Sequence, residues 1–251
     1  MRDALTDFLR FTMERFAPYA VAAPLLARAL TRVGESRVVD LCSGGGGPWR
    51  DLIRRIPAAG GPAVQVTLTD AYPNRAAFAR MERETDGAVR GVAEPVSATD
   101  VPERLTGMRT VFTALHHFPP QSARAILADA VRRNVAIAVF EIAERSLLSV
   151  LGMLFLPLFV LLATPFIRPF RWSRLLVTYL VPLVPLVVWF DGTVSCLRAY
   201  TPAELRALTD GLGGGFAWDI GSIRWARLPT RVTYAIGVPA RGQAAGSSPA
   251  V

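Results

Sequence analysis

The stretch SRVVDLCSGGGGPW occupies residues 36–49. Val38, Val39 and Leu41 form a short β-branched and apolar run, which is typical of a buried parallel strand, and Asp40 lies near its end. Four glycines, Gly44 to Gly47, follow, and Pro48 then suits the first turn of a helix with the sequence WRDLIRRI. A strand, a glycine turn and a helix in this order let the backbone approach a ligand that a Cβ atom would hold away.

The glycine spacing argues against a dinucleotide-binding turn, which needs the pattern G-x-G-x-x-G. A frame that starts at Gly44 puts Trp49 at the third glycine, and a frame that starts at Gly45 puts Arg50 there. Either side chain would spoil the close contact between helix and strand that this glycine permits. A nicotinamide-dependent oxidoreductase is therefore a disfavoured alternative.

Residues 40–46, DLCSGGG, are similar to D-x-G-x-G-x-G, the nucleotide-loop signature of class I S-adenosylmethionine-dependent methyltransferases. Cys42 replaces the first glycine of that signature, and a turn without a ligand is the alternative for the motif alone. The resemblance implies an α/β fold with a mostly parallel seven-stranded sheet whose last strand is antiparallel. It also implies that S-adenosyl-L-methionine is bound by Asp40, Cys42, Ser43, Gly44 and Gly46.

Expected strands and helices alternate along the chain. Further strands are predicted over residues 64–70, 92–97, 109–115 and 135–144, and a closing pair over 216–224 and 231–238. Five such alternations indicate a doubly wound parallel sheet, and the closing hairpin is what the methyltransferase sheet would have. Residues 3–32 show apolar positions at helical spacing, interrupted by Pro18 and Pro24, and we expect them to cover the sheet edge or the ligand.

Asp70 ends the second predicted strand, 24 residues beyond Gly46, about the spacing at which an acid reaches ribose hydroxyls in such folds. A carboxylate can accept from both hydroxyls; a helix N-cap is the alternative. Tyr72 follows and is predicted to lie against the adenine. Thr99 and Asp100 resemble the adenine-binding corner of the family, with an ordinary turn as the alternative. Leu115, at the end of its strand, completes the predicted cofactor set.

His116 and His117 are the only histidines, and both follow the fourth predicted strand. The carboxyl edge of an open α/β sheet lines the ligand crevice, and an ordinary imidazole suits a general base at neutral pH. We therefore predict both as catalytic candidates, with helix capping or packing under the cofactor as the alternative. No metal is expected, because neighbouring residues on a strand point to opposite faces.

Three further residues are predicted to address the acceptor. Glu141 sits late in the fifth strand, where an edge salt bridge is the alternative. Arg198 and Tyr200 lie where the chain re-enters the domain, where ordinary surface roles are the alternative. A helix should begin after them, with Thr201 as N-cap and Glu204 completing a capping box.

An apolar insertion separates the fifth strand from that helix. Leu147 to Ile167 is 21 residues without a charge, and Leu175 to Phe190 is 16 more. Both carry prolines, and Arg168, Arg171 and Arg174 lie between them. A two-pass hairpin would place these arginines opposite the catalytic domain, against the positive-inside tendency. We expect an in-plane or re-entrant hairpin whose arginines meet anionic headgroups, with a lid or dimerisation arm as the alternative.

Composition limits the partners and the compartment. All 28 basic residues are arginine against 20 acidic residues, a net charge of +8 that favours anionic surfaces. No basic run with interleaved aromatic residues indicates nucleic acid. Two cysteines without metal or disulfide spacing favour a reducing compartment, and the N-terminal residues lack the apolar region of a signal peptide. We expect the cytoplasmic face of a membrane, or the soluble cytoplasm as the alternative.

The expected organisation has four parts. Residues 1–35 are N-terminal helices, residues 36–145 and 192–240 form the cofactor-binding domain, residues 146–191 are the insertion, and residues 241–251 are a disordered tail. The resemblance implies in-line methyl transfer to a small, lipophilic acceptor, with proximity and orientation supplying much of the rate. A membrane-tethered cofactor-binding module without catalysis is a further alternative. The acceptor, the atom methylated and the oligomeric state stay open.

Overall fold

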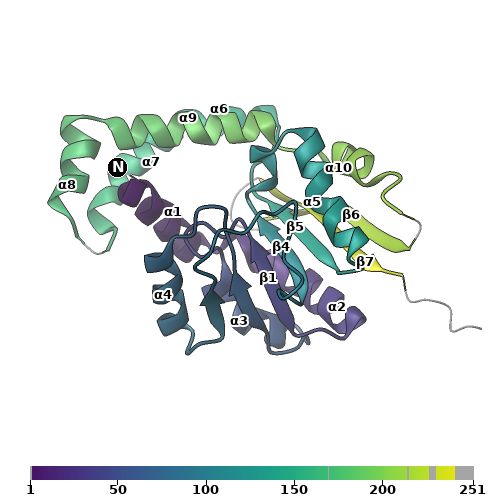
Figure 1. The fold of residues 1–251 in the computed structure, drawn as a ribbon. Coiled ribbons are helices and arrows are strands. Elements are labelled where there is room, and N and C mark those ends of the chain that lie inside the picture. The colour runs from purple at the N-terminus through teal and green to yellow at the C-terminus, as the bar shows by residue number, and fades with distance from the viewer. Residues whose placement is uncertain (1, 169, 214, 226–229, 241–251) are drawn as a thin grey trace, which may run out of the picture.

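One mixed sheet of seven strands organises the chain (Figure 1). The structure, a computed structural model, describes residues 2–168, 170–213, 215–225 and 230–240, so the expected tail lies outside the described residues. The strands are β1 Arg37–Leu41, β2 Gln65–Leu68, β3 Val89–Gly91, β4 Met108–Phe112, β5 Ile137–Glu141, β6 Phe216–Arg224 and β7 Arg231–Pro239. Their order is β3-β2-β1-β4-β5-β7-β6, and β7 runs antiparallel to both neighbours. The expected α/β sheet is confirmed.

Helices cover both faces of the sheet because successive strand residues point to opposite sides. Val38 belongs to the apolar cluster under α2 and α3, whereas Val39 belongs to the cluster under α5 and α10. The helices are α2 Ala23–Val33, α3 Trp49–Ala58, α4 Arg75–Glu84, α5 Pro120–Arg132 and α10 Pro202–Thr209. We call the sheet with these helices the sheet domain. Val38, Val39 and Leu41 of β1 are apolar because both faces of this strand are buried.

The third strand lies three residues earlier than expected. Residues 92–97 form a loop, and the Val96 N–H donates to the Asp70 carbonyl at 2.9 Å. Pro95 lacks the backbone donor that a strand would use here. In β3 itself, a Cβ atom on Gly91 would lie 2.3 Å from the Phe78 ring, so only glycine lets α4 pack on this strand.

The N-terminal residues divide between two parts of the molecule. The 3-10 helix η1 (Pro18–Ala22) and α2 pack on the sheet, in the same cluster as α3. Helix α1 (Arg2–Phe16) instead packs Ala4 and Phe8 against the insertion, in a separate cluster with Val160, Ala163, Ile167, Val184 and Val188. Helix α1 also reaches the sheet domain, because Met13 packs on the sheet cluster and a Cβ atom on Gly45 of the glycine turn would lie 3.2 Å from Thr6. The N-terminal helices therefore cover the sheet and the glycine turn, and α1 contacts the arm as well.

The insertion forms an arm of short helices over residues 147–198, which ends seven residues beyond the expected boundary. Its elements are α6 Leu147–Gly152, η3 Met153–Phe155, α7 Leu156–Ala163, η4 Thr164–Phe166, α8 Trp172–Leu175, the π-helix η5 Leu176–Leu180 and α9 Leu183–Arg198. Residues 191–195, a more polar stretch of the sequence, lie inside α9. A Cβ atom on Gly192 would lie 2.9 Å from the Met153 sulfur, so this glycine serves close packing of α9 on η3.

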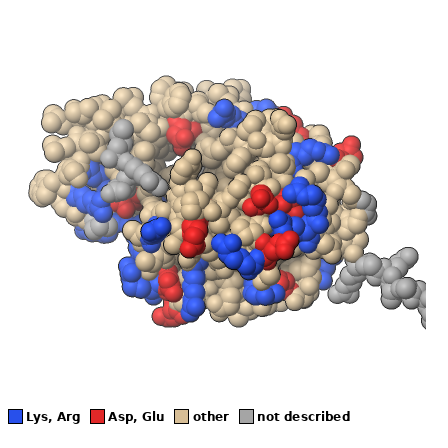
Figure 2. Space-filling model, in the orientation of Figure 1, with Lys and Arg blue, Asp and Glu red and all other residues tan. Residues whose placement is uncertain are grey.

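The arm projects from the sheet domain and exposes its apolar side chains. Helix α9 runs along the top of the view in Figure 1, and this upper part of the surface carries few charges in Figure 2. By length and composition, the 20-residue segment Leu147–Phe166 can cross a membrane. Trp172–Leu180 and Leu183–Arg198 pass the same test only as one pair, bent by 73°.

One arginine of the arm does not have the exposed position that was predicted from the sequence. Arg174 is only 3% exposed, forms an ion pair with Asp7 of α1, and donates to the Ile167 carbonyl at 2.9 Å. It therefore joins α1 to the arm and does not face a headgroup region. Arg168 is exposed, and its carbonyl accepts a hydrogen bond from Arg10 of α1.

Candidate active site

The glycine turn between β1 and α3 is built from left-handed backbone. Cys42 has φ 56°, and Gly44, Gly46 and Gly47 have φ values of 51°, 110° and 60°. Cys42 thus adopts the conformation that the glycine of the family pattern adopts freely, at a cost of about 1–2 kcal/mol for a residue with a Cβ atom. Burial, followed by the charges of nearby acids, raises the pKa of its thiol to about 12. Cys42 therefore shapes the turn and is no thiolate nucleophile.

Asp40 lies beneath this turn with 1% of its surface exposed. Its carbonyl accepts from the Ser43 hydroxyl at 2.9 Å and the Thr69 hydroxyl at 2.8 Å, and its Oδ1 accepts from the Thr110 hydroxyl at 2.7 Å. Burial raises the pKa of Asp40 to about 6, against the opposing effect of the Thr110 hydrogen bond. The predicted residues Asp40 and Ser43 are thus brought together as the support of the turn.

Asp70 closes the turn from the next strand. Its Oδ2 accepts from the Gly44 N–H at 2.8 Å, and its Oδ1 accepts from the Tyr72 N–H at 2.8 Å. The alternative role as a helix N-cap is wrong, because Asn74 caps α4 by accepting from the Ala77 N–H at 3.1 Å. Asp70, Gly44 and Tyr72 therefore form one cluster, as the sequence predicts.

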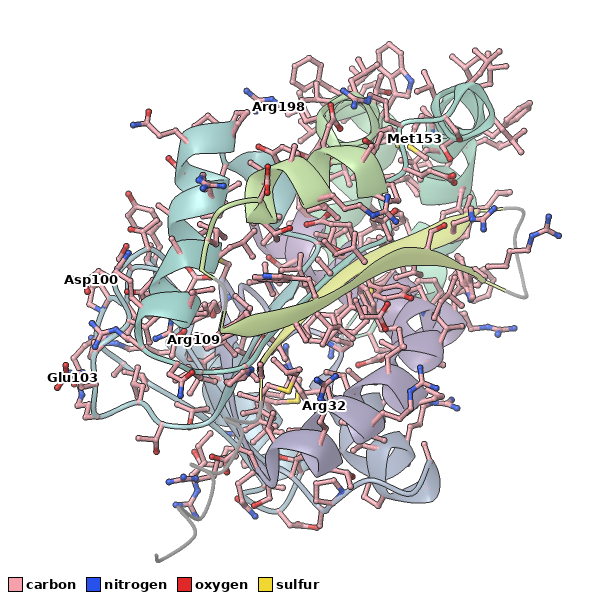
Figure 3. The ribbon with its side chains drawn as sticks, turned by 90° about the vertical axis from the view of Figure 1, so that its right-hand side faces the viewer. Arg32, Asp100, Glu103, Arg109, Met153 and Arg198 are labelled. Atoms are coloured by element: carbon pink, nitrogen blue, oxygen red, sulfur yellow. The ribbon has the colours of Figure 1, made fainter. Side chains whose placement is uncertain are left out.

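Two predicted cofactor residues are not brought to this cluster. Asp100 leaves 80% of its side chain exposed and pairs with Arg133, at the end of α5, at 3.1 Å. Thr99 bonds the Ser97 hydroxyl at 2.9 Å. Figure 3 shows Asp100 beside Glu103, which also pairs with Arg133. The misplaced third strand explains the error, because the loop after it turns back toward the start of β4.

A buried acid and a histidine meet at the ends of β4 and β5. Glu141 is fully buried, and its Oε1 accepts from the backbone N–H groups of Ala114 at 3.1 Å and Leu115 at 2.7 Å. Its Oε2 lies 2.6 Å from Nδ1 of His116. Glu141 is thus part of the histidine site and forms no edge salt bridge, while Leu115 contributes a buried backbone donor.

The neighbours of His116 fix the tautomer that a neutral ring adopts. An ionised carboxylate only accepts, so Nδ1 donates to Glu141, and Nε2 of a neutral ring is then an acceptor. The Ser195 hydroxyl lies 3.1 Å from Nε2 and can donate to it in this tautomer. Ser195 belongs to α9 of the arm, so the arm completes a chain of three side chains: Glu141, His116 and Ser195. The sequence analysis missed Ser195, for which no local signal exists.

His117 has a different environment from its neighbour. The two rings lie 4.2 Å apart between centroids, but His117 is exposed whereas His116 is buried. Partial burial, together with the nearby His116, lowers the pKa of His117, and the charge of Asp191 on α9 opposes this. His117 is therefore neutral at neutral pH and faces outward, under α9.

The predicted acceptor residues at the end of the arm, Arg198 and Tyr200, have separate roles. Tyr200 donates from its hydroxyl to the Phe118 carbonyl at 2.7 Å, which holds the end of the arm against the histidine loop. Arg198 is exposed at the end of α9 (Figure 3). Thr113, just before the histidines, has φ 47°, and its buried Oγ1 has no partner. Such strain in a β-branched residue is typical of functional sites.

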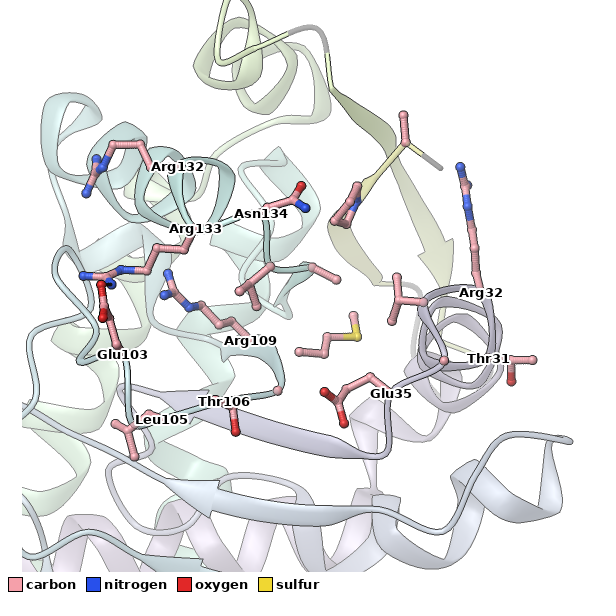
Figure 4. A pocket seen from close by; sticks show the side chains of 18 of the residues that line it. Thr31, Arg32, Glu35, Glu103, Leu105, Thr106, Arg109, Arg132, Arg133 and Asn134 are labelled. Atoms are coloured by element: carbon pink, nitrogen blue, oxygen red, sulfur yellow. Dashed lines mark hydrogen bonds and ion pairs between the residues drawn. The ribbon is translucent and has the colours of Figure 1, made fainter. Parts of the chain in front are cut away.

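A cavity of about 800 Å³ lies at the opposite edge of the sheet (Figure 4). Its lining precedes β1, β4 and β5, away from the carboxyl ends where ligands of open α/β sheets bind. Arg109, Arg132 and Arg133 share the buried Asp129 at 2.5, 2.6 and 3.3 Å, and Arg133 also pairs with Asp100 and Glu103, so three acids face three arginines. We interpret this edge as structural. Within the described residues, no cluster of His, Cys, Asp or Glu could hold a metal ion.

Comparisons with known proteins identify the fold. No family model matches the sequence, and no curated protein matches it. An O-methyltransferase family protein from Burkholderia thailandensis superposes with a TM-score of 0.57 at 17% identity, over 96% of this chain and 60% of the other. Human N-acetylserotonin methyltransferase, in complex with S-adenosylmethionine, superposes with a TM-score of 0.55 at 12% identity, over 95% and 56%. The S-adenosylmethionine-dependent methyltransferase SibL gives 0.51 at 15% identity, over 88% and 55%.

These likenesses assign a fold class. The strand order with one antiparallel strand, the glycine turn and the superpositions together show the class I methyltransferase fold. The chain spans about 60% or less of the length of these three structures. The identities of 12 to 17% leave activity, substrate and partners to be argued from the residues themselves.

Proposed function

We propose that the protein transfers a methyl group from S-adenosylmethionine to a hydroxyl group of a small lipophilic molecule at a membrane surface. One observation carries the proposal: a Glu141–His116 pair of 2.6 Å at the carboxyl edge of a methyltransferase sheet. A hydroxyl acceptor must lose a proton, and a neutral imidazole backed by a carboxylate is a general base for that proton.

The residues of the glycine turn fit the cofactor. A Cβ atom on Gly44 would meet nothing within 4 Å, so the backbone is open on that side. Each Asp70 oxygen accepts one N–H bond and keeps a second lone pair for a ribose hydroxyl. Tyr72 is 82% exposed, which leaves its ring free to stack on an adenine. When bound there, S-adenosylmethionine would supply an electrophilic methyl group.

The chain's own contribution is proton transfer and orientation. Glu141 is fully buried, so its charge stabilises a protonated His116 in surroundings of low dielectric. Two backbone N–H groups fix the carboxylate, and the carboxylate fixes the ring. The base is thus held in position before the reaction, and this proximity and orientation lower the barrier to methyl transfer.

The arm supports the membrane and acceptor parts of the proposal. Of the 21 exposed large hydrophobic side chains among the described residues, nineteen lie between Leu147 and Leu197. An apolar surface of this size on a chain of charge +8 fits an anionic bilayer, entered from the side by an in-plane hairpin. A lipid-soluble acceptor would then be available where the arm meets His116. The proposal puts the protein on the cytoplasmic face of the membrane, where S-adenosylmethionine is made.

Calorimetry with S-adenosylmethionine and with NADH tests the cofactor. We expect S-adenosylmethionine alone to bind, and Asp70→Ala to lose that binding while its circular dichroism spectrum is unchanged. Asp100→Ala is the matched control, because Asp100 is an exposed acid outside the cluster. Binding of NADH instead, or full affinity in Asp70→Ala, would contradict the proposed site.

Mass spectrometry of lipid extracts tests the reaction. Extracts are incubated with the protein and with S-adenosylmethionine labelled in its methyl group. We expect a labelled methyl ether that is absent with Glu141→Gln. Cofactor binding without any labelled product would indicate a binding module without catalysis.

A further inference from the structure

We propose further that Ser195 relays the acceptor's proton to His116, so that the arm supplies a catalytic residue. This role rests on the proposed methyl transfer. It explains how an acceptor passes its proton to a base that is buried. His116 is 3% exposed, while Ser195 is partly exposed and lies 3.1 Å from Nε2.

The burial of His116 blocks direct contact with an acceptor. Nδ1 is taken by Glu141 at 2.6 Å, one side of the ring faces His117 at 4.2 Å, and Nε2 faces Ser195. A general base must lie within about 2.6–3.2 Å of the proton that it removes, or act through one intervening hydroxyl or water. The Ser195 hydroxyl is the group that occupies this intervening position.

A serine hydroxyl has the donors and acceptors that a relay needs. It has one proton, which it donates to Nε2, and two lone pairs, which can accept from an incoming hydroxyl. Thr193, two residues earlier on α9, instead donates to the Trp189 carbonyl of its own helix at 2.8 Å. Among the described residues, His116 is the one hydrogen-bond partner found for the Ser195 hydroxyl.

The proton steps balance. The acceptor's O–H bond breaks and its proton passes to Ser195 Oγ, while the Ser195 O–H bond breaks and its proton passes to His116 Nε2. The acceptor oxygen keeps the electron pair and becomes the nucleophile, Ser195 is restored as a hydroxyl, and His116 becomes an imidazolium against the Glu141 carboxylate. The Nδ1 proton stays on His116, so Glu141 remains ionised.

The test compares three variants of α9. Ser195→Ala removes the relay, Ser195→Thr keeps a hydroxyl, and Thr193→Ala is the matched control. With the labelled product from the lipid extract, we expect Ser195→Ala to lower kcat by about 10–100-fold, a part of the 10²–10⁴-fold typical of general base catalysis. The KM for S-adenosylmethionine should not change. Ser195→Thr should retain most of kcat, and Thr193→Ala all of it.

A second readout needs no acceptor. The chain has two histidines, so ¹⁵N spectra of histidine-labelled protein contain two imidazoles, which His117→Gln assigns. We expect Nδ1–H with an accepting Nε2 for His116, and an Nε2 resonance that moves in Ser195→Ala and returns in Ser195→Thr.

The outcomes separate this role from the proposed function. Wild-type turnover with full activity in Ser195→Ala would overturn the relay and leave the methyl transfer standing. Loss of activity in His117→Gln with no effect of Ser195→Ala would overturn it in favour of His117 as the base. If the wild-type protein transfers no methyl group, the proposed function and the relay both fail. If the Nε2 resonance of His116 does not move in Ser195→Ala, the hydrogen bond between the two residues is itself refuted.

Discussion

The sheet domain and the arm use the same apolar residue types in opposite ways. Val39, Val139 and Phe140 of the sheet are fully buried, while Leu147, Phe155 and Leu180 of the arm are more than 70% exposed. Burying such a side chain stabilises a fold by about 1.5–3 kcal/mol, and an exposed one contributes little. Both regions are hydrophobic in sequence, but the arm buries only one small cluster with α1 and leaves most of its large apolar side chains exposed. On the proposed function, these exposed side chains contact a bilayer.

Two of the contacts that link the arm to the rest of the chain differ in kind. Asp7 and Arg174 form a buried ion pair between α1 and the arm, and Ser195 meets His116 between α9 and the site. The first holds the arm to α1, and the second links the arm to the chemistry. Breaking either contact therefore tests whether one region can change while the other stays intact.

The largest expected effect is on vesicle binding. We replace Leu154, Phe155, Leu158 and Leu162, each at least 55% exposed, with glutamine, which a helix tolerates. Binding to vesicles with anionic lipid should weaken by about tenfold per side chain, because each loses over ~1.4 kcal/mol of burial in the bilayer. The thermal midpoint should hardly move. Flotation and calorimetry measure the two quantities.

The control for this variant uses Leu9→Gln with Tyr72→Gln, which are the exposed large hydrophobic residues outside the arm in the part of the chain that the structure describes. This double variant should bind vesicles as the wild type does. A wild-type protein that purifies without detergent and ignores vesicles would contradict the membrane role. A dimer that dissociates in the four-residue variant would indicate a dimerisation arm.

Breaking the ion pair should loosen the arm and leave the sheet domain intact. Asp7→Ala strands the charge of Arg174, which is 3% exposed, at a cost of about 3–5 kcal/mol. Hydrogen exchange should rise in residues 156–188, and exchange in β1 and β4 should stay unchanged. Changing Asp7 and Arg174 together to leucine and methionine should restore protection. Equal loosening of both regions would show that the arm and the sheet fold as one unit.

Within the sheet domain, Asp40 limits stability. Its pKa is raised from 3.8 to about 6, so the folded state binds more protons than the unfolded state between these values. Stability from this group therefore falls as pH rises from about 4 to 6, and above pH 6 the buried charge costs about 3 kcal/mol. Asp40→Asn should stabilise the fold at pH 8 and lose this advantage at pH 4.

Urea unfolding at pH 8 and pH 4 measures this difference. Asp86→Asn, an exposed acid before β3, is the control and should shift neither curve. Lower stability of Asp40→Asn at pH 8 would mean that the ionised carboxylate holds the turn more strongly than its burial penalises it.

The sheet domain was predictable because its signals are local. Alternating runs give the strands, four glycines give the turn, and Thr201 with Glu204 gives a capping box that the structure contains. Asp70 was found from its spacing after the glycines. The error at Thr99 and Asp100 arose from one strand boundary, because β3 ends at Gly91 and the predicted strand 92–97 forms a loop.

The links to the arm were not predictable, because they join distant positions. Ser195 and His116 are 79 residues apart, and Asp7 and Arg174 are 167 apart. Neither pair has a motif, and both depend on how the arm's broken helices bend. Arg174 in particular was predicted to be one of three arginines that meet lipid headgroups, whereas it is buried because of where α1 lies.

The smallest expected effect concerns Tyr72. Among the described residues of the sheet domain it is the one large hydrophobic side chain that is exposed, at 82%, and it lies beside Asp70. By analogy with the arm, we expect this exposed ring to contact a ligand, here one adenine ring. Tyr72→Ala should weaken S-adenosylmethionine binding by about tenfold, from a stacking contribution of ~1–3 kcal/mol, without changing stability. Tyr72→Phe keeps the ring and should bind normally. Calorimetry that finds equal affinity for all three proteins would make Tyr72 an ordinary surface residue, and the arm would then be the one region whose exposed apolar side chains bind a ligand.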